Sequence, residues 1–177
     1  MTKIVSICIL ILCMSLVSCN TLMGYIGAGG SLSAPNDLTV NLYDADGKAI
    51  DLERSNYELP NHSCWEPAIS VVHYFSITNN TDHDVTYTVS LEIKDVEHDL
   101  TEVVYYAVIK GAKYKDTISL ENYSLKSLND GTNDVVNNVV IPSGSTQYYA
   151  IGFYMSPSAG NQYQGGDFKA VLDVKIN

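Results

Sequence analysis

The sequence predicts an all-β protein: an antiparallel β-sandwich with one or two short helical insertions. Several segments alternate apolar and polar residues without a break, which is the pattern of a strand with one buried face. Stretches rich in Asn, Asp, Gly, Ser and Pro separate these segments and have the composition of turns. Because each one-sided strand must bury its apolar face, many short strands favour two sheets packed together.

The two clearest strands lie in the first half of the chain. Residues 85–93 place Val85, Tyr87, Val89, Leu91 and Ile93 on one face. Residues 70–78 precede them, with Val71, His73, Phe75 and Ile77 on one face. The polar stretch 79–84 supplies turn residues between the two segments. We therefore predict that they form a hairpin.

Two further strands are predicted near the C-terminus, over residues 147–155 and 168–176. Pro142-Ser143-Gly144-Ser145 opens the first, and the loop 160–166 separates the two. Nearer the N-terminus, Leu38, Val40 and Leu42 alternate before Asp44-Ala45-Asp46-Gly47, which predicts a hairpin turn.

Two segments in the middle of the chain indicate the helical insertions. Asp99-Leu100-Thr101-Glu102 has the D-x-x-E spacing of a helix N-terminus. Residues 124–128 could form another short helical turn before Asp130-Gly131.

The N-terminal residues predict export. Lys3 precedes an apolar run over residues 4–17 that is short for a transmembrane helix, so we interpret residues 1–18 as a signal peptide. The run ends in Leu16-Val17-Ser18-Cys19, a pattern similar to a bacterial lipobox, and Cys19 would then be the lipidated first residue of the mature protein. The alternative is an ordinary export signal that is cut elsewhere.

Removal of residues 1–18 from the 177 leaves 159, enough for one domain with a sizeable core. We assign residues 19–36 to a flexible tether or donor segment and residues 37–177 to the sandwich domain. The mature chain keeps two cysteines, Cys19 and Cys64, so no disulfide framework is expected; Cys64 is a buried, inert thiol or a reactive one. The formal charge of −10 disfavours binding to nucleic acid.

The strand 70–78 is preceded by Trp65-Glu66-Pro67-Ala68, and the strand 168–176 is preceded by residues 159–165, AGNQYQG. These two segments resemble the TasA/camelysin family of bacterial surface and biofilm-matrix proteins. The WEPA segment, Trp65-Glu66-Pro67-Ala68, resembles the family's W-E-P-G, with Ala68 in place of the glycine, and is followed by a strand, a polar turn and Tyr87. The second, which we call the AGNQYQG segment, covers residues 159–165 and resembles the family's A-G-N-x-Y-Q-G after a P-G-x-S/T strand opening. The family-motif residues taken from it are Asn161, Tyr163, Gln164 and Gly165.

The resemblance covers about Leu38 to Ile176 and implies a jelly-roll-like β-sandwich. It assigns structural roles to Trp65, Glu66, Pro67, Tyr87 and the four residues of the AGNQYQG segment. In the best-known members it also implies polymerisation into matrix fibres, in which the N-terminal strand of one subunit completes the sheet of the next. A segment such as residues 24–35 could act as that strand or as a plain tether.

Part of the family is named for a metalloendopeptidase activity, but the chain lacks the H-E-x-x-H of zinc proteases. Its histidines are His62, His73, His83 and His98, of which His73 is expected in the core. Glu97-His98-Asp99 and Asp82-His83-Asp84 are read as solvated loop charges, and Asp44-Ala45-Asp46-Gly47 lacks the remaining ligands of a calcium loop. We therefore expect no catalytic residue, metal or cofactor.

The function that the sequence favours is that of a non-enzymatic, exported structural protein of the cell surface or biofilm matrix. The lipid on Cys19 suggests an accessory or anchoring subunit, held at the membrane and able to self-associate or to join fibre subunits. Two alternatives remain: a camelysin-like metalloendopeptidase, and a surface lipoprotein that binds a glycan or a host protein.

Overall fold

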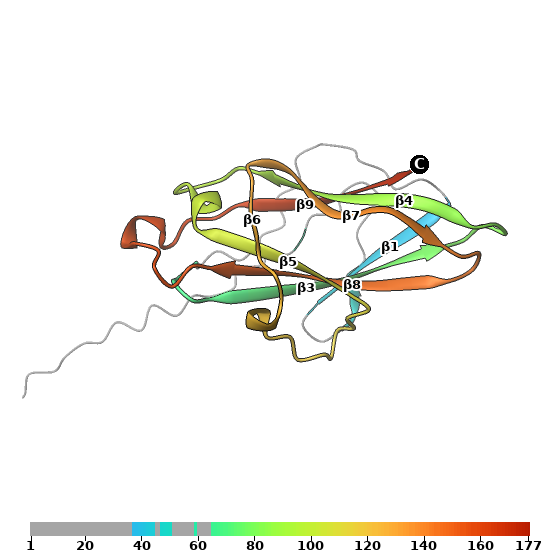
Figure 1. The fold of residues 1–177 in the computed structure, drawn as a ribbon, viewed down its shortest axis with the longest axis horizontal. Helices are drawn as coiled ribbons and strands as arrows, with labels where there is room; N and C mark the ends of the chain where they lie inside the picture. Colours follow the sequence, from blue (N-terminus) through green and yellow to red (C-terminus); the bar gives the residue numbers. More distant parts are fainter. Residues whose placement is uncertain (1–36, 45–46, 51–58, 60–64) are drawn as a thin grey trace, which may run out of the picture.

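The computed structural model of the 177-residue chain describes residues 37–44, 47–50, 59 and 65–177. Within them, nine strands form two antiparallel sheets that face each other across a common core (Figure 1). The all-β, two-sheet prediction is confirmed. Sheet A has the order β2-β1-β3-β8-β5-β6, and sheet B has the order β7-β4-β9.

The bounds of the elements are as follows. Sheet A contains β1 (Leu38–Tyr43), β2 (Ala49–Ile50), β3 (Ser70–Asn79), β5 (Val104–Lys110), β6 (Lys126–Ser127) and β8 (Thr146–Met155). Sheet B contains β4 (Val85–Lys94), β7 (Gly131–Ile141) and β9 (Lys169–Ile176). Three short 3-10 turns lie between strands: η1 (Leu100–Glu102), η2 (Leu120–Asn122) and η3 (Asn161–Tyr163).

The alternating residues of the sequence line the core as predicted. In β4 every second residue from Val85 to Ile93 is buried, and the residues between them are half-exposed. The largest fully buried side chains are those of Trp65, Tyr87, Tyr149, Phe75 and Phe153. Burying a side chain of this size contributes roughly 1.5–3 kcal/mol, so this aromatic layer is a main source of stability.

The predicted hairpin of residues 70–78 with 85–93 is wrong. β3 pairs with β1 and β8 in sheet A, whereas β4 pairs with β7 and β9 in sheet B. The loop 80–84 therefore carries the chain from one sheet to the other, and the apolar faces of the two strands meet across the core. Alternation sets which face of a strand is buried, but it does not set the strand's neighbour.

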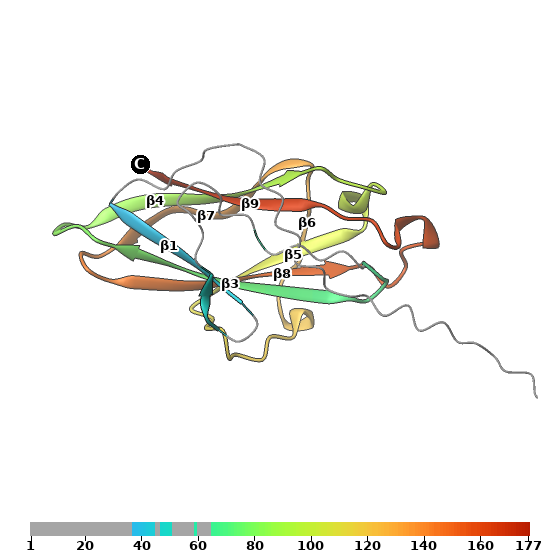
Figure 2. The same ribbon diagram turned by 180° about the vertical axis from the view of Figure 1, so that it is seen from behind.

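A two-stranded ribbon passes from sheet A to sheet B. The loop 80–84 joins β3 to β4 and the turn 142–145 joins β7 to β8, while β3 pairs with β8 and β4 with β7. Figure 2 shows the ribbon from behind, with both connections at the same end of the sandwich. The turn Pro142–Ser145 does precede β8, as predicted.

Other local predictions had mixed outcomes. The β1–β2 hairpin is confirmed, since Leu42 pairs with Ile50. The helix start at Asp99 is a single 3-10 turn, and Asp99 makes no side-chain capping bond. The helical turn predicted over residues 124–128 is wrong, because η2 ends at Asn122 and β6 pairs with β5 there.

The strand β7 was not predicted from the sequence. Its alternation is interrupted because its pairing with β4 shifts register twice, between Tyr87 and Val89 and between Val89 and Ser90. Asn138 has a φ of 50°, in the left-handed region. The inserted residues break the period of two on which the sequence pattern depends.

Candidate functional site

The two segments that carry the family resemblance meet at one end of the sandwich. The amide of Gly165 donates a hydrogen bond to the carbonyl of Trp65, with an N···O distance of 3.2 Å. The Trp65 side chain is 2% exposed and stacks on Phe168, with ring centroids 5.3 Å apart. It also makes an edge contact with Phe153 of β8. We call this region the marker end.

The WEPA segment forms a tight turn before β3. The amide of Ile69 donates to the carbonyl of Glu66, and the amide of Ala68 donates to that of Met155. Ala68 has a φ of 67°, in the left-handed region that favours glycine because a Cβ is strained there. The position at which the resembled family carries glycine is therefore one whose backbone geometry favours glycine.

The AGNQYQG segment is attached to the η1 region by side chains. The Tyr163 hydroxyl donates to Glu102 Oε2 at 2.7 Å, and this bond to a carboxylate raises the pKa of Tyr163. His98 Nδ1 lies 3.2 Å from the carbonyl oxygen of Gln164. A Cβ on Gly166 would lie 2.9 Å from His98, so the chain approaches His98 closely at this glycine. Asn161 accepts a hydrogen bond from the Gln164 amide group.

Tyr87, the remaining family-motif residue, does not belong to the marker end. It is buried between the sheets with Tyr149, and the two hydroxyl oxygens are 2.6 Å apart. Both lie within 2.8 Å of Gln147 Oε1, and Gln147 Nε2 donates to the carbonyl of Val140. The pKa of each tyrosine is raised, mainly because its hydroxyl is buried. These polar groups are satisfied within the core, which is a structural arrangement.

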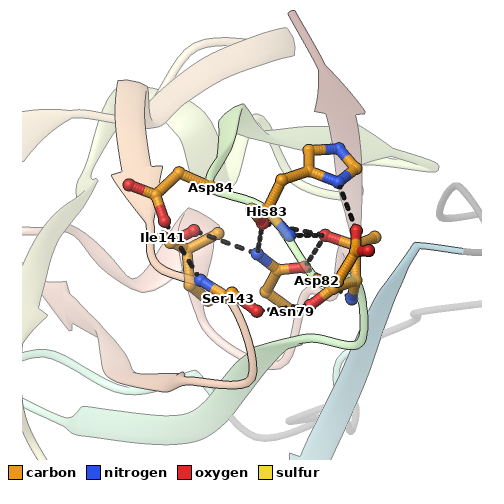
Figure 3. A network of polar contacts seen from close by, with 7 residues as sticks. Asn79, Asp82, His83, Asp84, Ile141 and Ser143 are labelled. Atoms are coloured by element: carbon orange, nitrogen blue, oxygen red, sulfur yellow. Dashed lines mark hydrogen bonds and ion pairs between the residues drawn. The ribbon is translucent and has the colours of Figure 1, made fainter.

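A second polar network holds the opposite end, which we call the ribbon end (Figure 3). Asn79 is fully buried at the end of β3, and its Nδ2 donates to the carbonyls of His83 and Ile141. Its Oδ1 accepts the amide and the hydroxyl of Thr81. Ser143 donates to the carbonyl of Thr81 and to Asp84 Oδ1. The loop and the turn of the ribbon are thereby joined.

The sequence predicts Asn79 only as a turn residue, and it predicts Gln147 and Tyr149 only as members of the strand 147–155. Asn79 could have been recognised as a polar residue at the end of an alternating strand. The cluster of Tyr87, Tyr149 and Gln147 could have been recognised from Gln147, which is polar but shares an apolar strand face.

The histidines do not gather into one centre in the part of the chain that the structure describes. His73 is half-buried and makes an edge contact with Phe153. His83 is exposed, and its hydrogen bond to Asp82 lowers the pKa of that carboxyl. Across these described residues no group of three His, Cys, Asp or Glu side chains could hold a metal ion.

Several predicted residues lie outside the described residues. They are Cys19, Cys64, His62, the signal peptide 1–18, the segment 19–36 and residues 45–46 of the Asp44–Gly47 turn. Among the described residues, no helix is both long enough and apolar enough to span a membrane.

Comparisons of the chain with protein-family models, with curated proteins and with solved structures found no match. The resemblance to the TasA/camelysin family is therefore carried by the WEPA and AGNQYQG segments alone.

Proposed function

We propose that the chain is an exported, non-enzymatic structural protein of the TasA/camelysin type, held at the cell surface or in the biofilm matrix. The observation that carries this proposal is the junction of the two resembling segments. Trp65 and Gly165 are a hundred residues apart in the sequence and share a backbone hydrogen bond. Residues that resemble a family in sequence and also build one structural unit are better support than two isolated matches.

The topology supports the jelly-roll-like part of the proposal. In a jelly roll, antiparallel pairs of strands fold over so that each pair contributes to both sheets. The β3–β4 and β7–β8 ribbon has this arrangement. β5 extends sheet A on the far side of β8, so that the ribbon strands of sheet A have neighbours on both sides.

The edge of sheet A offers a place for assembly. β2 pairs with β1 only at Leu42 and Tyr43, so the stretch Leu38–Asn41 has no strand partner on that side among the described strands. A strand donated there could form several main-chain hydrogen bonds, each contributing about 1 kcal/mol net. We propose that residues 20–36 supply this strand, and that a lipid on Cys19 makes the chain an accessory or anchoring subunit.

The experiment compares two unlipidated chains, one starting at Asn20 and one at Asp37. We expect both to fold, with similar thermal unfolding, and only the longer chain to form larger species in sedimentation velocity at high concentration. If both stay monomeric, assembly through this segment is refuted. If the shorter chain fails to fold, residues 20–36 belong to the chain's own sheet. Mass spectrometry of the native protein tests the anchor, because an unmodified N-terminus downstream of Cys19 contradicts it.

We also propose that the protein has no zinc-dependent protease activity, since the paired-histidine helix of such enzymes is missing from the sequence. Purified protein should leave casein intact with or without added zinc. Stoichiometric bound zinc together with cleavage that a chelator abolishes would overturn this proposal.

A further inference from the structure

The outer face of sheet A, together with the loop that covers it, is rich in tyrosine. Seven of the eleven tyrosines in the described residues lie there: Tyr43, Tyr74, Tyr105, Tyr114, Tyr123, Tyr148 and Tyr154. The outward positions of β4 in sheet B carry instead Thr86, Thr88, Ser90, Glu92 and Lys94. The two exterior faces of the sandwich therefore differ in chemistry, although both belong to the same domain.

The tyrosine-rich face is covered by the loop 111–125, which is fixed by specific contacts. Leu120 packs on Gly152, where an added Cβ would lie 2.2 Å from the leucine side chain. The Tyr74 hydroxyl donates to the carbonyl of Asp116 at 2.8 Å. Buried Ala107, Ile109 and Ala150 of the sheet, together with Ala112 of the loop, complete this apolar cluster. The loop is therefore packed against sheet A, and this packing fixes the positions of its side chains.

Two lysines of this loop each lie over a tyrosine ring. The Lys113 Nζ atom is 5.2 Å from the centre of the Tyr148 ring, and the Lys115 Nζ atom is 5.3 Å from that of Tyr114. Both lysines are exposed. Contact with a ring orients each ammonium group and leaves its charge in place.

The first part of this loop is basic, whereas the whole chain is acidic; over residues 111–125 Lys113 and Lys115 are balanced by Asp116 and Glu121. Residues 110–115 contain three lysines and no acidic residue, in a protein with a formal charge of −10. The nearest carboxylate in sequence is that of Asp116, and it accepts a hydrogen bond from the amide of Lys113. Tyr114 in turn stacks on Tyr43 of β1, with centroids 6.2 Å apart.

We propose that this tyrosine–lysine face, formed by the loop 111–116 with Tyr43 and Tyr148, binds an acidic polysaccharide that carries carboxylates. Pyranose rings present flat C–H surfaces that stack on tyrosine rings, and the sugar carboxylates would pair with Lys113 and Lys115. Binding of this kind needs no self-association, so it would persist if the proposed assembly fails.

Charge density favours a polysaccharide over a nucleic acid. A nucleic acid carries a phosphate at every nucleotide and depends on contacts from many cations. Here two lysines, Lys113 and Lys115, would face a ligand on a strongly acidic molecule, whose overall field repels a dense polyanion more than a sparsely charged one. The few lysines of this face match a ligand with few negative charges. Its many tyrosine rings match a ligand with many pyranose rings.

The experiment measures binding of purified protein to polygalacturonate by affinity electrophoresis and calorimetry, with dextran as the neutral polymer and oligothymidylate as the nucleic acid. We expect binding to polygalacturonate alone. The double variant K113Q/K115Q should bind about five- to tenfold more weakly, as expected for the loss of two exposed charge contacts, and K113R/K115R should bind like the parent. Tyr148→Thr, which keeps a strand-forming residue, should also weaken binding.

The matched control is K94Q/K175Q, which removes two lysines from sheet B, where they pair with Glu92 and Asp173. It should bind like the parent. The proposal is overturned if polygalacturonate does not bind, if the control loses as much affinity as K113Q/K115Q, or if oligothymidylate or dextran binds as tightly as polygalacturonate. Circular dichroism of each variant establishes that its fold is retained.

Discussion

The two ends of the sandwich, which lie at opposite ends of its long axis (Figure 1), are held together by different chemistry. At the marker end, Trp65 packs between Phe168 and Phe153 and the Gly165 amide closes the junction. At the ribbon end, buried Asn79 makes side-chain hydrogen bonds to the backbone on both sides of the ribbon. The buried side-chain contacts of the first end are mainly apolar, whereas those of the second are polar.

This difference indicates what each end contributes. Apolar burial stabilises without strict geometry, whereas buried hydrogen bonds add modest net stability and fix one alignment of the groups that they join. We therefore expect the marker end to determine overall stability. The ribbon end should determine which strands become neighbours, because the loop 80–84 and the turn 142–145 both carry the chain between the sheets there.

The largest effect is expected for Trp65→Ala. Removing the indole leaves a cavity against Phe153 and Phe168, and large-to-small changes of this kind cost about 3–5 kcal/mol. Urea unfolding measures the change in the free energy of unfolding. Tyr123→Ala is the control, because this aromatic residue is 39% exposed and should cost clearly less, about 1 kcal/mol. Equal losses in the two variants would contradict the assignment of Trp65 to the core.

Asn79→Ala should have the next largest effect, about 2–3 kcal/mol. The change leaves buried carbonyls and the Thr81 groups without their partner. Ser143→Ala serves as the comparison, because its hydroxyl bond to Thr81 is exposed and should contribute well under half as much. If Asn79→Ala lowers the free energy of unfolding as much as Trp65→Ala does, the proposed distinction between the two ends is wrong.

Ala68→Gly should increase stability by about 1 kcal/mol, since it relieves a left-handed conformation at a residue with a Cβ. The matched change Ala159→Gly lies in the other resembling segment and has no left-handed φ to relieve, so it should not stabilise. Thermal unfolding of both variants checks this prediction. A fall in the melting temperature of Ala68→Gly would show that the turn is not strained.

The smallest expected effect is a dependence of stability on alkaline pH. Burial raises the pKa values of Tyr87 and Tyr149 above their ordinary value of 10.0. At pH above about 10 the unfolded chain loses these protons while the folded chain keeps them, so stability is full below that pH and falls above it. In Tyr87→Phe the decrease between pH 9 and pH 11 should be shallower. An identical pH profile for the variant would exclude this pair as the cause.

The sequence predicted the faces of the strands better than their partners. Alternation correctly identified the buried face of residues 85–93, and Pro142–Ser145 correctly marked the start of β8. The sequence predicted β4 as the neighbour of β3, whereas β3 pairs with β1 and β8. Strand pairing depends on contacts between residues far apart in the chain, which a local pattern does not contain. β7 was not predicted, because its two register shifts interrupt the alternation of apolar and polar residues.

The candidate site was predicted in part. The WEPA and AGNQYQG segments were recognised by resemblance, but their contact through Trp65 and Gly165 could not be read from either segment alone. The loop 111–125 was not recognised, because its fit on Gly152 depends on tertiary packing that has no local sequence pattern.

The central claim is that the two resembling segments form one structural unit. Hydrogen exchange of the Gly165 amide, followed by NMR, tests it most directly, because this amide donates to the carbonyl of Trp65. The account predicts that the Gly165 amide is protected, and that Trp65→Ala accelerates its exchange far more than Asn79→Ala does, relative to each variant's global stability. A Gly165 amide that exchanges as fast as that of exposed Gly144 in the folded parent protein would contradict the claim.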